Sequence, residues 1–142
     1  MKPRIFQTHS EEETVALGER LAAELPAKAV VLLIGNLGAG KTTLAKGIVK
    51  GLGAAELSEV SSPTFTLVHE YSPSVYHIDL YRLDTPAQVA TLGLEEIFDR
   101  RAVVLIEWGE KFPELMPEDR IEIRLRATGD NSREVDLSNR LP

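Results

Sequence analysis

Hydrophobic residues along this chain follow two patterns that predict two kinds of strand. Two runs are continuously apolar, Ala29–Ile34 and Ala102–Ile106, and short runs of this kind indicate strands buried on both faces. Residues Ile121–Arg126 instead alternate strictly between apolar and charged side chains, which predicts a strand with one solvated face. A polar turn and a second strand near Glu134–Leu137 complete a terminal hairpin.

Helical spacing accounts for most of the remaining apolar residues. Leucines recur every fourth residue from Leu17 to Leu25, and Ser10 stands as N-cap of a capping box with Glu13 at N3. This pattern predicts a helix that ends before Pro26. Further elements are predicted as helices over 41–52, 86–92 (N-cap Thr85) and 94–98, and as a hairpin of 65–71 and 75–80 around a Ser-Pro-Ser turn.

The order of these elements predicts an α/β protein. A three-layer sandwich, with helices on both faces of a largely parallel sheet, accommodates two strands that are apolar on both faces. We expect the alternating runs to be antiparallel additions to that sheet. Ligands bind beyond the carboxyl ends of parallel strands. Gly35 and Glu107 lie where the two apolar runs end, so we expect both residues to lie at a ligand-binding site.

Length and composition predict one soluble domain spanning residues 1–142. Hydrophobic residues make up 43% and charged residues 27%, which is ordinary for a globular protein with a substantial core. No apolar run is long enough to span a bilayer and no signal-peptide pattern opens the chain, so we expect no membrane association. The chain contains no cysteine, which excludes disulfides and thiolate metal sites, and we expect a cytoplasmic location.

The net charge is −6, and it bears on nucleic-acid binding. Proteins that bind nucleic acid without a partner do so largely by neutralising phosphates with basic side chains. This chain is therefore not expected to do so alone, although it can serve a nucleic-acid pathway through partner proteins.

A glycine-rich segment between the first apolar run and the next predicted helix carries the clearest chemistry. Residues 35–42, Gly-Asn-Leu-Gly-Ala-Gly-Lys-Thr, fit the phosphate-binding pattern G-x-x-x-x-G-K-[ST] in its required strand–loop–helix context. In this pattern Lys41 reaches the β- and γ-phosphates and the Thr42 hydroxyl binds Mg²⁺. We expect a nucleoside triphosphate to be held by Gly35, Leu37, Gly38, Ala39, Gly40, Lys41, Thr42 and Thr43.

Two carboxylates end predicted strands and are candidates for the metal and the hydrolytic chemistry. Glu107 follows the second apolar run, where a P-loop protein supplies its second metal contact, so it either holds Mg²⁺ or orients the attacking water. Asp79 ends the run that begins at Val75 and is either a base, a group that supports the metal through its bound ligands, or a turn or cap aspartate. His77 lies in the same run, and a single strand histidine is more often a packed or hydrogen-bonded structural residue than a ligand; no zinc site is expected.

Two further positions are open to more than one interpretation. Ser62-Pro63-Thr64 is either a switch-type loop, in which Thr64 senses the γ-phosphate, or simply the loop that enters a strand. Trp108 is either a core residue or an anchor that faces a partner. The Asn-Lys-x-Asp element that reads guanine in many GTPases is absent, which favours ATP over GTP.

Four motifs in order resemble one known family. They are Gly35–Thr43, Ser62–Val68 (Ser-Pro-Thr-Phe-Thr-Leu-Val), His77–Leu83 (His-Ile-Asp-Leu-Tyr-Arg-Leu) and Ile106–Trp108 (Ile-Glu-Trp). Together they resemble the TsaE family, small P-loop ATPases of tRNA threonylcarbamoyladenosine biosynthesis, over roughly residues 10 to 126. The last three motifs are far more specific than the phosphate loop, which a vast superfamily shares. The family often has an acidic residue where Asn36 stands, so one charge near the phosphates is missing here.

The resemblance implies an ATPase that works with the TsaB and TsaD proteins, of which TsaD transfers the threonylcarbamoyl group to an adenosine beside the tRNA anticodon. It implies that Lys41 and Thr42 bind phosphates and Mg²⁺ and that Glu107 supports the metal. Asp79 and Thr64 are implied to belong to the hydrolytic or switch machinery. The chain would meet tRNA only indirectly, through the complex.

Two other functions remain open from the sequence. One is a small-molecule P-loop kinase, although such enzymes need arginines and a closing lid for which this chain has little room. The other is a nucleotide-gated binding module, in which ATP shapes an interface and hydrolysis is incidental.

Overall fold

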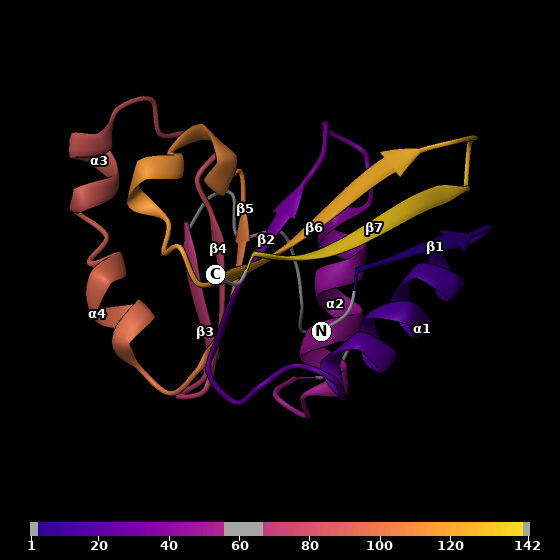
Figure 1. Cartoon of the computed structure of the whole chain (residues 1–142), viewed down its shortest axis with the longest axis horizontal. Helices are drawn as coiled ribbons and strands as arrows, with labels where there is room; N and C mark the ends of the chain where they lie inside the picture. Colours follow the sequence, from indigo (N-terminus) through magenta and orange to yellow (C-terminus); the bar gives the residue numbers. More distant parts are fainter. Residues whose placement is uncertain (1–2, 56–66, 141–142) are drawn as a thin grey trace.

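The described part of the chain, residues 3–55 and 67–140, folds around one mixed sheet (Figure 1). In this computed structural model the sheet has seven strands in the order β1-β7-β6-β2-β5-β4-β3. The strands are β1 (Arg4–Thr8), β2 (Ala29–Ile34), β3 (Val68–Ser72), β4 (Val75–Asp79), β5 (Val103–Glu107), β6 (Arg120–Ala127) and β7 (Arg133–Arg140). The helices are α1 (Glu11–Ala22), α2 (Lys41–Gly51), α3 (Pro86–Ala90) and α4 (Leu94–Asp99), with short 3-10 turns at Gly109–Lys111 and Pro113–Leu115.

The central strands β6, β2, β5 and β4 are parallel to one another, and β3, β7 and β1 pair antiparallel at the two edges. The largely parallel sheet with antiparallel additions is confirmed. The expectation that the alternating run Ile121–Arg126 is an antiparallel addition is wrong, because this run forms β6 and belongs to the parallel core. β6 alternates because one of its faces packs inward through Ile123 while the other exposes Arg124 and Arg126, so alternation here reports an uncovered face and not strand direction.

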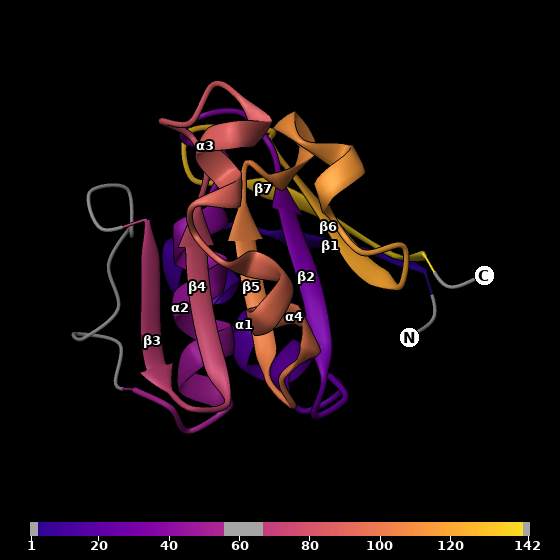
Figure 2. The same cartoon turned by 90° about the vertical axis from the view of Figure 1, so that its left-hand side faces the viewer.

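Helices cover both faces of the central sheet, as expected for a three-layer sandwich. Figure 2 shows α1 and α2 behind the sheet and α3 and α4 in front of it. Successive side chains of β2 point to opposite faces of the sheet. Val31 and Leu33 pack in the core beneath α1 and α2, and Leu32 packs in the core beneath α3 and α4. β2 is therefore held from both sides, and the loop that follows it starts from a fixed point.

The two helices behind the sheet lie in close contact because glycines line their interface. A Cβ atom added at Gly47 of α2 would lie 2.1 Å from the Val15 carbonyl oxygen of α1, and one added at Gly18 would lie 2.6 Å from the Leu44 carbonyl oxygen. No side chain fits there. This contact fixes α2, whose first turn carries the residues of the phosphate loop.

The four predicted helix starts are confirmed, and the helix lengths differ from the predicted ones by a few residues. The Ser10 hydroxyl accepts a hydrogen bond from the Glu13 amide (3.1 Å). The Glu13 carboxylate accepts from the His9 amide (2.8 Å) and not from the Ser10 amide, so the capping box is only half formed. α1 ends at Ala22, earlier than predicted. Thr85 caps α3 with both bonds of the box. Strand β1 and the two 3-10 turns were not predicted.

Candidate functional site

The phosphate loop connects β2 to α2 in a conformation that needs its glycines. Gly38 and Gly40 have φ angles of +80° and +102°, values that L side chains rarely adopt. A Cβ atom at Gly38 would meet nothing within 4 Å, so this part of the loop borders open space. Gly40 serves as N-cap of α2, and its carbonyl accepts the first helical bond from Leu44. The loop therefore presents backbone and a helix N-terminus to one side, an arrangement suited to anions.

Lys41 lies folded against this loop. Its side chain is buried, Nζ donates to the Gly35 carbonyl at 2.7 Å, and Nζ also stands 3.6 Å from the centre of the Trp108 ring. Burial lowers the pKa of Lys41 below its ordinary value, and the carboxylates of Glu107 and Asp79 oppose that effect. The lysine is thus held at the edge of the pocket by a carbonyl and an aromatic face.

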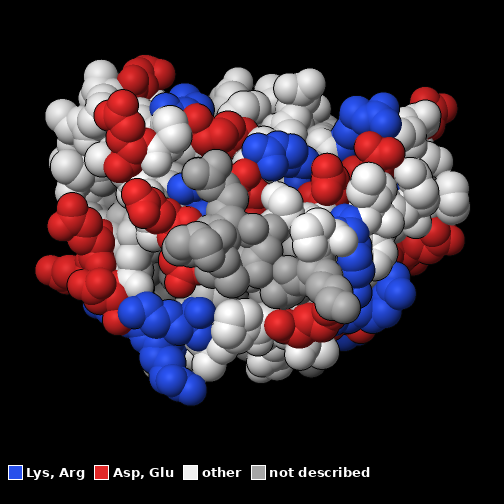
Figure 3. Space-filling view, in the orientation of Figure 1, with Lys and Arg blue, Asp and Glu red and all other residues white. Residues whose placement is uncertain are grey.

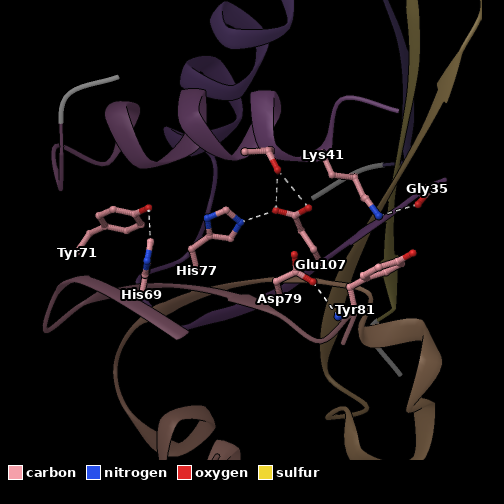
Figure 4. Close-up of polar contacts among 9 residues, drawn as sticks. Gly35, Lys41, His69, Tyr71, His77, Asp79, Tyr81 and Glu107 are labelled. Carbon is pink, nitrogen blue, oxygen red and sulfur yellow. Dashed lines mark hydrogen bonds and ion pairs between the residues drawn. The ribbon is translucent and has the colours of Figure 1, made fainter. Parts of the chain in front are cut away.

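The carboxyl ends of β4 and β5 supply the acidic side of the site. Asp79 and Glu107 are partners in the parallel register, and their exposed fractions are only 3% and 4%. The Thr42 hydroxyl donates to the Glu107 carboxylate, at 3.1 Å from Oε2 and 3.3 Å from Oε1. His77 Nε2 lies 2.6 Å from Oε2 of the same carboxylate. Asp79 accepts from the Tyr81 amide at 2.8 Å, the contact of a turn aspartate. Figure 4 shows His77, Glu107 and Asp79 grouped opposite Lys41.

These two sides enclose a pocket of about 360 Å³. Its lining residues are Leu37, Gly38, Gly40, Lys41, Thr42, Thr43, Asp79, Tyr81, Glu107, Trp108 and Arg133. The pocket thus joins the phosphate loop to both strand-end carboxylates.

The remaining predicted residues occupy different places. Gly35 lies against β6, where an added Cβ atom would be 2.6 Å from the Leu125 carbonyl oxygen, and Ala39 is buried. Leu37 is 68% exposed at the tip of the loop. Thr64, with the Ser62-Pro63 pair, lies outside the described residues.

Three residues of this site were missed or left undecided by sequence reasoning. His77 was expected to be a packed or hydrogen-bonded structural residue, and it is both, but sequence reasoning did not identify Glu107 as its partner. Arg133, the first residue of β7, donates to the Gly38 carbonyl at 3.2 Å and lines the pocket; no motif in the sequence marks it. Trp108 is half-buried and packs against the core on the α3/α4 side, and it also lines the pocket, with Lys41 Nζ over its ring and the Tyr81 ring 5.1 Å away. Its alternative role as an anchor for a partner stays a prediction.

The oxygen atoms that the protein offers in this pocket suit a hard divalent cation whose other ligands are water and phosphate. Within the described residues no three His, Cys, Asp or Glu side chains gather as a metal site. Thr42 and Glu107 offer a hydroxyl and a carboxylate within hydrogen-bonding distance of each other. Mg²⁺ prefers oxygen ligands and takes one or two from the protein, with the rest from water and phosphates. These residues fit Mg²⁺ bound together with a nucleotide.

A mixed sheet with a parallel centre, covered by helices on both faces and carrying G-x-x-x-x-G-K-T between β2 and α2, defines an α/β protein of the P-loop class. The crystal structure of Bacillus subtilis YdiB has the same fold, with a TM-score of 0.80, 34% identity, and coverage of 99% of this chain and 87% of that chain.

The family is given by the sequence comparisons. Residues 8–135 match the model of "Threonylcarbamoyl adenosine biosynthesis protein TsaE". The tRNA threonylcarbamoyladenosine biosynthesis protein TsaE of Bacillus subtilis (strain 168) is 40% identical over 138 residues, which cover 95% of this chain and 85% of that protein. The protein of the same name from Rickettsia bellii is 39% identical over 134 residues, 92% of each chain. The chain therefore belongs to the TsaE family, and the resemblance seen in its four motifs is confirmed.

Proposed function

We propose that this chain binds ATP with Mg²⁺ in the pocket between the phosphate loop and the ends of β4 and β5, and hydrolyses it in support of tRNA threonylcarbamoyladenosine biosynthesis. The observation that carries the proposal is the contact of Glu107 with Thr42 (3.1 and 3.3 Å). It joins the carboxylate of one buried strand to the hydroxyl of the phosphate loop, the pair from which P-loop proteins build a metal site.

Each side of the pocket has its own task in this proposal. The loop from Gly38 to Thr42 binds the phosphates through backbone amides and the N-terminus of α2. Lys41 exchanges the Gly35 carbonyl for a phosphate oxygen, a stronger partner because both groups are then charged. Mg²⁺, when bound, neutralises charge that develops on the phosphates.

The carboxylates act on the water that attacks. Glu107 supports the metal or orients this water, and Asp79 stands beside it at the end of the neighbouring strand. Both are buried on the protein side, so their oxygens face few competing waters. The assignment of Thr64 to the same hydrolytic or switch machinery rests on the family resemblance alone.

We further propose TsaB and TsaD as the partners, with tRNA met through their complex. The charge of the chain supports an indirect role, since the net charge is −6. Among the described residues on the face in Figure 3, Lys and Arg form separate small groups interspersed with Asp and Glu, and no continuous basic stripe crosses it. We propose a cytoplasmic location. None of the helices described is long and apolar enough to cross a membrane.

The proposal is tested by reconstituting the modification of tRNA from purified TsaB, TsaD and this chain with a threonylcarbamoyl donor, followed over several turnovers per TsaD. We expect modification to continue past the first turnover only when this chain and ATP are present, and to stop there with Lys41→Ala. Equal yields with and without the chain would overturn the proposal.

One further variant and one added acceptor separate partner-coupled hydrolysis from the alternative functions. If Glu107→Gln binds ATP and still supports repeated modification, ATP only shapes an interface and the chain is a binding module. Acceleration of ATP consumption by a small-molecule acceptor in place of the partners would indicate a kinase.

A further inference from the structure

His77 occupies a position that packing alone does not explain. It lies in the middle of β4 with no exposed surface, and its Nε2 is 2.6 Å from Glu107 Oε2 (Figure 4). Its other ring nitrogen, Nδ1, is buried and finds no hydrogen-bond partner among the described residues. Burying an imidazole with one nitrogen unsatisfied costs free energy. An apolar residue of similar size would avoid that cost, so the bond to Glu107 is the feature that needs a histidine.

The imidazole approaches Glu107 from within the protein and not from the pocket. Asp79 and Glu107 line the pocket, whereas His77 does not. A carboxylate accepts hydrogen bonds, so Nε2 carries the hydrogen and donates. Oε2 receives this bond together with one from the Thr42 hydroxyl. His77 therefore cannot touch a ligand, but it determines where the carboxylate that faces the ligand is held.

We propose that His77 is a positioning residue that holds the Glu107 carboxylate beside Thr42 and thereby sets the affinity of the nucleotide complex for its divalent cation. Carboxylates that bind metals are themselves held by hydrogen bonds, and loss of such a partner typically weakens metal binding about 10- to 100-fold. Without the bond from Nε2, the carboxylate keeps the bond from Thr42 but loses its second anchor, so it can rotate out of the orientation in which it and Thr42 face the metal together. This inference rests on the proposed function, because it concerns the metal of the same site.

The chain offers a close control for His77. His69 lies directly opposite on β3, in register with His77, and its Nδ1 bonds to the Tyr71 hydroxyl at 3.1 Å. It belongs to the same hairpin but makes no contact with Glu107 that the structure records. Replacing His69 therefore reports what the loss of any histidine does to this hairpin.

The test measures binding of Mn²⁺ to the protein with a non-hydrolysable ATP analogue, by the loss of the free Mn²⁺ signal in electron paramagnetic resonance. The variants are His77→Leu, His77→Asn, His77→Gln and His69→Leu, and analogue affinity is measured separately in EDTA. We expect His77→Leu to weaken Mn²⁺ binding about 10- to 100-fold. The affinity for the analogue without metal should change by less than about threefold. His77→Gln, whose amide nitrogen reaches as far as Nε2, should recover most of the loss, and His69→Leu should behave as wild type.

His77→Asn keeps the test decisive if the leucine variant does not fold, because its shorter amide cannot reach Glu107 and should reproduce the Mn²⁺ loss. Wild-type Mn²⁺ affinity in the leucine or asparagine variant would overturn the positioning role. An equal loss in the glutamine variant, or an equal loss of metal-free affinity, would overturn it too. If the wild-type complex binds no Mn²⁺, the proposed function itself fails, and that result is distinct from these.

Discussion

The phosphate loop is one continuous segment, whereas the acidic side of the pocket is assembled from strands that are distant in the sequence. The loop acts through backbone: Gly38 and Gly40 take positive φ angles and α2 begins at Lys41. The acidic side acts through buried side chains that the parallel register of β4 and β5 sets beside one another, Asp79 against Glu107. The loop offers an anion backbone amides and the Lys41 amine, whereas the acidic side depends on each of its carboxylates. We therefore expect the loop to control affinity and the strand ends to control metal binding and turnover.

The largest effect is expected from Glu107→Gln, which keeps the shape of the side chain and removes its charge. ATP turnover with Mg²⁺ should fall about 100-fold or more, the size expected for loss of a group that orients or activates water. ATP affinity in EDTA should stay within about threefold of wild type. Steady-state hydrolysis and calorimetric titration measure the two quantities, and unchanged turnover would contradict the role of Glu107.

The next effect tests the loop side. Lys41→Ala removes the one lysine among the described residues that line the pocket, and affinity for ATP should fall about 10- to 100-fold, as expected for a lost charge-assisted hydrogen bond. Calorimetry in EDTA measures this without the metal. Lys46→Ala, in the same helix but outside this pocket, is the matched control and should bind as wild type. Equal affinities for the two variants would show that the loop does not bind the phosphates through Lys41.

A smaller effect is expected where β7 supports the loop. Arg133→Ala removes the bond to the Gly38 carbonyl and should weaken ATP affinity about 3- to 10-fold, the size of one hydrogen bond. Arg126→Ala is the control, because it removes a 67% exposed arginine of the same hairpin that pairs with Glu134 and lies outside the pocket. If both variants weaken binding equally, the effect comes from charge in general and not from the loop contact.

The smallest effect concerns the pH dependence of stability. The pKa of Lys41 is lowered in the folded protein, chiefly by burial, so between that pKa and the ordinary value near 10.5 the unfolded chain binds more protons. Stability then rises with pH across this window relative to a variant without the lysine. We expect the melting temperature of wild type minus that of Lys41→Met to increase by a few degrees or less from pH 7 to pH 10. A difference that stays constant or decreases would contradict the burial of the charged amine.

The same contrast explains what could be predicted from the sequence. The loop was predicted residue by residue because its chemistry lies within nine consecutive positions, and β2 and α2 follow from local patterns. Glu107 and Asp79 were identified as strand ends, but their pairing needs the register of two strands, which no local pattern encodes. His77 and Arg133 depend entirely on such long-range placement: one becomes a partner of Glu107 and the other reaches Gly38 from β7.

Glu122 shows the same limit within a strand. Strict alternation predicted a solvated side chain, yet Glu122 is only 5% exposed and lies between Arg120 and Arg124. Burial alone would raise the pKa of this carboxyl, but hydrogen bonds from the two arginines outweigh burial and lower it. Pairing with neighbours on the same strand thus lets a charged residue stay buried at a position that the pattern assigns to solvent.

The most direct test of the site is a crystal structure with Mn²⁺ and a non-hydrolysable ATP analogue, with anomalous scattering to locate the manganese. We predict that the phosphates lie against the amides from Gly38 to Thr42 and that one manganese peak lies between Thr42 and Glu107. A nucleotide bound elsewhere, or a manganese peak away from Glu107, would contradict the conclusion that the loop and the strand ends act on one nucleotide.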